Sequence, residues 1–194
     1  MGSKPSRSAR ASRLTESALE LLRDFQTVLI VDDSRSMKGE LWKQTAEEVE
    51  DVFNKVTPTN STPMGRKLQS LLEPYLAALK SNPNLKRVNY IVITDGAPTD
   101  RAETEPELVI VNAARELDSR HASFSQVGIQ FVQIGGNTAA TRYLESLDNS
   151  LRTKYNIRDI VDTTLVPVGK PLDMIKILTG GINRRVDDHG SKGL

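Results

Sequence analysis

The sequence predicts an α/β fold, in which helices cover both faces of a mainly parallel sheet of about four strands. Apolar runs rich in Val and Ile recur along the chain, as is typical of strands buried on both faces. Segments with apolar residues at helical spacing lie between these runs. Acidic residues also follow two of the runs directly, at the end of a strand where such sheets bind ligands.

The first half of the chain alternates between helix and strand. Apolar spacing predicts a short helix over residues 15–25, and the run Val28-Leu29-Ile30-Val31 predicts a buried strand over residues 27–31. A helix is expected over residues 42–56, followed by a loop rich in turn-forming residues over 57–65. Five apolar residues at helical spacing then predict a helix over residues 66–80.

The second half continues the alternation. Strands are predicted over residues 87–93, 129–134 and 157–161, and helices over residues 105–118, 139–147 and 171–178. We expect one folded domain over residues 15–186, preceded by a disordered basic arm over residues 1–14 and followed by a frayed tail over residues 187–194.

Composition excludes several classes of protein. The 194 residues contain no cysteine, which rules out a disulfide framework and a thiolate metal site, and the presence of only two histidines argues against a zinc centre. No apolar run approaches the roughly 20 residues that span a bilayer. Beyond the basic arm, acidic side chains outnumber basic ones, so we expect no nucleic-acid binding.

The basic arm carries four cations and no acid. Gly2 follows the initiator Met, and Ser6 lies four residues further on, which matches an N-myristoylation signal. An acyl chain beside a basic cluster would give peripheral membrane contact. A cloning remnant and a plain solvated tail are the alternative interpretations of the same residues.

Oxygen-bearing side chains gather at the ends of the predicted strands. Asp32, Ser34 and Ser36 follow the first strand at alternate positions, Thr62 lies in the loop before a helix, and Asp95 follows the second strand. Carboxylate and hydroxyl oxygens in one place suit Mg²⁺ or a similar hard cation. Capping of the next segment is the alternative role for the loop at Asp32.

These residues also resemble a known motif. Asp32-x-Ser34-x-Ser36, Ser61-Thr62-Pro63 and Thr94-Asp95-Gly96, in this order, resemble the metal-ion-dependent adhesion site of the von Willebrand factor type A domain. The resemblance covers residues 20–186 and is greatest to the intracellular fungal branch of that family, especially over residues 127–131 and 157–163.

The resemblance implies a Rossmann-like three-layer sandwich and a function without catalysis. Ser34, Ser36 and Thr62 would contact Mg²⁺, or Mn²⁺ or Ca²⁺, directly, and Asp32 and Asp95 would act mainly through water. A protein partner would complete the coordination with an acidic side chain. The implied location is cytoplasmic, with the acylated arm as a route to the membrane.

The chain departs from the family pattern in two places. Arg35 stands where the family has a small residue, and the long helix and further strand expected before Thr62 are missing. Residues 27–31 should then form an exposed apolar edge strand, which invites pairing with a second copy, recruitment of another chain, or aggregation.

Two alternative functions remain open from the sequence. The domain could be a scaffold whose site no longer holds metal, or a receiver-like domain that accepts phosphate on Asp95. The receiver interpretation is weakened by spacing, because Lys170 lies far beyond Asp95. Hydrolase and dinucleotide-binding functions lack their glycine-containing motifs.

Overall fold

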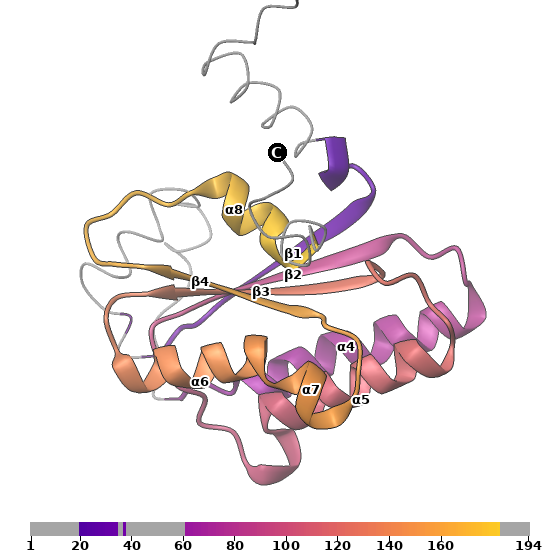
Figure 1. Ribbon diagram of the computed structural model, residues 1–194, viewed down its shortest axis with the longest axis horizontal. Helices are drawn as coiled ribbons and strands as arrows, with labels where there is room; N and C mark the ends of the chain where they lie inside the picture. Colours follow the sequence, from indigo (N-terminus) through magenta and orange to yellow (C-terminus); the bar gives the residue numbers. More distant parts are fainter. Residues whose placement is uncertain (1–19, 35–36, 38–60, 183–194) are drawn as a thin grey trace, which may run out of the picture.

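The strands form a single parallel sheet. The computed structural model describes residues 20–34, 37 and 61–182 (Figure 1). Within this part of the chain, the strands are β1 (Phe25–Val31), β2 (Arg87–Thr94), β3 (Val127–Ile134) and β4 (Val161–Val166), hydrogen-bonded in the order β1-β2-β3-β4. Every neighbouring pair is parallel, so the carboxyl ends of all these strands lie along the same edge of the sheet.

Helices cover both faces of the sheet, as Figure 1 shows. On one face lie α4 (Met64–Ser81), α5 (Pro106–Ser119), α6 (Thr138–Asn149) and the short α7 (Leu151–Tyr155), and on the other lies α8 (Met174–Thr179). Two 3₁₀ turns, η2 (Ala102–Thr104) and η3 (Gly180–Ile182), complete the described elements. The chain is therefore an α/β three-layer sandwich of the Rossmann-like kind, as predicted.

The alternation of side chains along each strand builds two cores. In β2, Tyr90 and Val92 face α4 and α5, whereas Ile91 and Ile93 face the side covered by α8. The larger core contains Phe131 with the apolar stripes of α4 and α5, and the smaller contains Ile177 of α8. Burial on both faces explains why β2 and β3 appear in the sequence as nearly continuous apolar runs.

The predicted elements are found with shifted ends, and some of the expected bounds were wrong. The first helix does not extend to residue 25, because residues 23–24 form a turn and Phe25 already pairs with Arg87 in the sheet. The loop predicted over 57–65 ends early, since Met64 and Gly65 belong to α4. Similarly, α8 begins at Met174 rather than at residue 171, with the Asp173 carboxylate accepting a bond from the Lys176 amide. The helix expected over 42–56, the basic arm and the tail lie outside the described residues.

The strand predicted over residues 157–161 was misplaced, because β4 begins only at Val161. The preceding residues are held away from a regular strand by Arg158, whose side chain is 4% exposed. Its Nε donates to Asp118 Oδ1 at 2.6 Å, and its backbone N–H donates to the other oxygen of the same carboxylate at 3.1 Å. The terminal guanidinium nitrogens donate to the backbone oxygens of Leu117, Ala122 and Ser123.

The sequence analysis missed α7, which is too short to show a helical period. Its last residues contact α5, where Lys154 Nζ donates to Glu107 Oε1 at 2.6 Å and the Tyr155 hydroxyl donates to the same oxygen. The hydrogen bond from Lys154, followed by that from Tyr155, lowers the pKa of Glu107 below its ordinary value. These contacts join the end of α7 to the first turn of α5.

Replacing Arg158 with alanine tests the role of this buried cation. We expect Arg158→Ala to lower the free energy of unfolding by about 1–3 kcal/mol, because three backbone oxygens and the partly exposed Asp118 lose a buried donor. Urea unfolding followed by circular dichroism measures the change. The exposed Arg142 on α6 is the matched control, and Arg142→Ala should stay within about 0.5 kcal/mol of the unchanged protein. Equal losses of stability in the two variants would contradict a stabilising role for Arg158.

Candidate metal site

The candidate site lies where β1 and β2 end. Val31 pairs with Ile93, and the Asp32 amide donates to the Ile93 oxygen at 2.8 Å, so the ladder continues one residue past β1. This pairing sets Asp32 beside Thr94, the last residue of β2. The parallel direction of the strands thus brings two polar segments together that are far apart in sequence.

The carboxylate of Asp32 is the centre of the hydrogen bonding at this edge. Its Oδ1 accepts from the Ser34 amide at 2.9 Å and from the Thr62 hydroxyl at 3.3 Å, and its Oδ2 accepts from the Thr94 hydroxyl at 2.6 Å. Asp32 is 8% exposed and Thr94 is fully buried. A buried carboxylate needs such donors, because an unpaired charge in the interior is costly.

Thr62 is held in place from the loop after β2. Its amide donates to the Thr99 hydroxyl at 2.8 Å, and the Thr99 amide donates to the Thr62 oxygen at 3.0 Å. Next to this pair, the carboxylate of Asp100 accepts from the amides of Gly65 and Arg66, both at 2.9 Å. Asp100 therefore satisfies two of the free N–H groups that begin α4, and the favourable charge at that helix end adds to the effect.

The loop after Asp32 is anchored by Met37. The Met37 amide donates to the Ser34 oxygen at 3.1 Å, and the Met37 side chain is fully buried in the core beneath α8. Ser34 is itself 5% exposed. Asp95, 7% exposed, directly follows Thr94 at the same edge of the sheet.

The structure thus brings Asp32, Ser34 and Thr62 together through direct hydrogen bonds and places Asp95 next in the chain to Thr94, which bonds Asp32. Ser36, the remaining predicted ligand, and Arg35 lie outside the described residues. The chemistry of the donors fits a hard cation. The Thr62 hydroxyl gives its hydrogen to Asp32, which leaves its oxygen lone pairs to face a cation.

Among the described residues, no group of three or more Asp, Glu, His or Cys side chains could hold a metal ion. A cation at this site would therefore depend on hydroxyl ligands together with two carboxylates. Because hydroxyls carry no charge, an ion that they contact directly, with both carboxylates acting through water, keeps much of its positive charge and favours an additional anionic ligand from outside.

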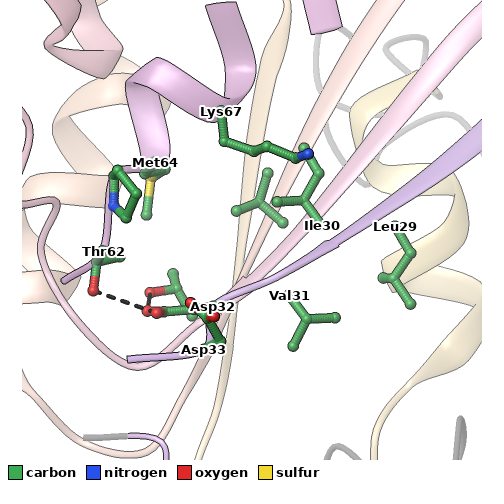
Figure 2. Close-up of a pocket in the computed structure, with 11 residues that line it drawn as sticks. Leu29, Ile30, Val31, Asp32, Asp33, Thr62, Met64 and Lys67 are labelled. Carbon is green, nitrogen blue, oxygen red and sulfur yellow. Dashed lines mark hydrogen bonds between the residues drawn. The ribbon is translucent and has the colours of Figure 1, made fainter. Parts of the chain in front are cut away.

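A cavity of about 310 Å³ opens next to Asp32 (Figure 2). One wall is polar and contains Asp32, Thr62 and Thr94, and the other is apolar and contains Ile30 and Met64 among its residues. Figure 2 shows the exposed Lys67 of α4 extending across this cavity toward Ile30. The cavity therefore presents a cation and apolar surface directly beside the candidate ligands.

Sequence reasoning missed the residues that support the ligands. Thr94 stood in the quoted Thr94-Asp95-Gly96 motif, and its place at the end of an apolar strand was a usable signal. Thr99 and Asp100 gave none, because they act on residues 34 or more positions away in the chain. Lys67 gave no signal either, because it is one of several polar residues on the exposed side of the amphipathic helix α4.

Comparison with known proteins gives no independent identification. No protein-family model matches the chain, and no curated protein is significantly similar to it.

No helix in the described ranges is long and apolar enough to cross a membrane.

Gly65 offers a test of how closely α4 packs on η2. A Cβ atom at Gly65 would overlap the backbone oxygen of Thr104 in η2. We expect Gly65→Ala to destabilise the protein by about 1–3 kcal/mol, although alanine normally favours a helix over glycine. Thermal unfolding measures the loss. Gly136→Ala is the control, since nothing lies within 4 Å of the added atom, and its melting temperature should stay close to that of the unchanged protein. A Gly65→Ala protein of unaltered stability would refute the close packing of α4 on η2.

Proposed function

We propose that this chain is an interaction module of von Willebrand factor A type, which binds a divalent cation, Mg²⁺ in the first place, and through it an acidic side chain of a protein partner. Asp32, Ser34, Ser36, Thr62 and Asp95 would hold the cation. Mn²⁺ and Ca²⁺ are the alternative ions. In this proposal the chain binds and does not catalyse.

The observation that carries the proposal is the convergence of two distant segments, together with its own loop, on the Asp32 carboxylate. Hydrogen bonds from Ser34, Thr62 and Thr94 fix its position before any ligand arrives. A cation site that is already organised does not have to order its side chains on binding, which favours affinity. Capping alone would not account for a hydroxyl from each of two distant segments on one buried carboxylate.

The cavity supports the second half of the proposal, the acidic partner. The Lys67 ammonium extends over the cavity toward Ile30, and a partner carboxylate that enters the cavity would be attracted both by it and by a cation. The apolar wall formed by Ile30 and Met64 would suit an aliphatic or aromatic residue next to that carboxylate.

Cation binding is the first consequence to measure. Asp32→Asn retains an oxygen that can accept hydrogen bonds but removes the charge, so we expect it to abolish Mg²⁺ binding in isothermal titration. In the unchanged protein, Mg²⁺ at about 100 times its Kd should raise the melting temperature by about 5–10 °C. Asp24→Asn is the matched control, because Asp24 is an exposed acid just before the other end of β1. If the folded protein shows neither heat on titration with Mg²⁺ nor a rise in melting temperature, the proposal fails and the metal-free scaffold becomes the better account of the function.

Substitution of Thr62 tests whether its hydroxyl contributes to cation binding. Thr62→Ser keeps the hydroxyl and should bind Mg²⁺ nearly as well as the unchanged protein, whereas Thr62→Ala should bind it about 10-fold more weakly or worse. Equal affinities of these two variants would exclude a metal-ligand role for the Thr62 hydroxyl.

Lys67 can be tested with a defined probe. We expect a fluorescent peptide with one aspartate between leucines to bind in Mg²⁺ but not in EDTA, and its asparagine counterpart to bind in neither. Lys67→Ala should weaken this binding about three-fold or more at low salt, because one attractive charge is lost. Lys80→Ala, at the far end of the same helix, should leave it unchanged. Fluorescence anisotropy measures all these affinities, and equal weakening by the two alanine variants would rule out a local role for Lys67.

A further inference from the structure

The two edges of the sheet differ in how their backbone is protected. In the order β1-β2-β3-β4, β1 and β4 each have a neighbour on one side only among the described strands. An edge strand exposes N–H and C=O groups on its outer side, which can pair with another chain unless something covers them. Which edge is covered therefore indicates where another strand can add.

The β4 edge is partly closed by its own side chains. The Gly135 amide donates to the Val166 oxygen at 3.0 Å, so even-numbered residues of β4 face β3 and odd-numbered residues face outward. Of the outward N–H groups, that of Val161 donates to the Asp159 carboxylate at 3.2 Å and that of Thr163 to the Asp148 carboxylate at 3.1 Å. Two acids thus occupy the donors that an added strand would need.

Among the residues that the structure describes, the β1 edge has no such protection. The bond from the Asp32 amide to Ile93 means that even-numbered residues of β1 face β2, and that Thr27, Leu29 and Val31 present their backbone outward. Within the described part of the chain, no hydrogen-bond acceptor meets these three N–H groups. The strand contains no Pro, Gly or charged residue, and the Leu29 side chain is 41% exposed.

We propose that β1 pairs antiparallel with β1 of a second copy of this chain, about a two-fold axis at Val28. In this register, Thr27 lies opposite Leu29 of the second copy and Phe25 lies opposite its Val31. All the outward-facing residues of the seven-residue strand then exchange hydrogen bonds, and no residue of either strand is left over. The result is one continuous sheet that crosses the dimer.

Charge at the ends of the strand favours this register and this occupant. Arg23 and Asp33 lie two residues outside β1, at its two ends. Antiparallel pairing about Val28 brings the end of β1 that carries Arg23 in each copy next to the end that carries Asp33 in the other, so opposite charges come near each other twice across the axis. A parallel arrangement would set like charges together instead. On the α8 face, Thr27 and the exposed Leu29 would cover one another across the interface.

The oligomeric state of the full chain tests the proposal without any metal. We expect sedimentation equilibrium in EDTA to show a dimer, and Leu29→Lys to weaken dimerisation at least about 10-fold, because a charged side chain on an edge strand opposes pairing. Leu165→Lys is the matched control, since Leu165 faces outward on β4 and is 46% exposed. This variant should dimerise normally. A monomeric unchanged protein, or equal effects of the two lysines, would overturn the proposal.

Exchange of the terminal charges tests the register. Arg23→Asp and Asp33→Arg should each weaken the dimer several-fold, and the double variant should restore it, because opposite charges then come near each other again with reversed sign. Circular dichroism and the melting temperature confirm that each variant is folded. A double variant weaker than both single variants would overturn the pairing of Arg23 with Asp33.

Discussion

The buried carboxylate of Asp32 connects the parts of the molecule on which the site depends. It receives hydrogen bonds from its own loop, from Thr62 shortly before α4 begins and from the end of β2. Each of these segments is then fixed by something else: Met37 anchors the loop, while Thr99 and Asp100 hold Thr62 and the start of α4. A change in the position of any one segment must therefore change the hydrogen bonding of the Asp32 carboxylate.

A buried group that stabilises the fold and the candidate ligands lie at opposite ends of the strands. Arg158 joins the end of α5 to the chain entering β4 at the amino edge of the sheet, and it uses its donors on a carboxylate and on backbone oxygens. The candidate ligands lie at the carboxyl edge, where loops can vary without loss of the core. In the described part of the chain, the buried cation and the candidate ligands therefore lie at opposite ends of the strands.

The sequence predicted the fold class well because burial on both faces gives β2 and β3 an unmistakable apolar run. It failed at residues 157–161, where an apolar run resembled a strand while Arg158, seen only as one charge in the sequence, held the chain in another conformation. The proximity of Asp32 and Thr62 followed from the topology, whereas the roles of Thr99 and Asp100 depend on long-range contacts with no local signal. The binding of a cation and the family itself remain predictions.

The most direct measurement of the central claim is the location of a bound ion in solution. Mn²⁺ added in small amounts to isotopically labelled protein broadens the NMR signals of nearby amides. We predict early broadening at Ser34, Thr62 and Gly96, reversed by excess Mg²⁺, while Asn84 at the opposite edge stays sharp. Broadening centred instead on Asp148, Asp159 and Asp162, which line a separate cavity, or no selective broadening at all, would contradict a cation site at Asp32.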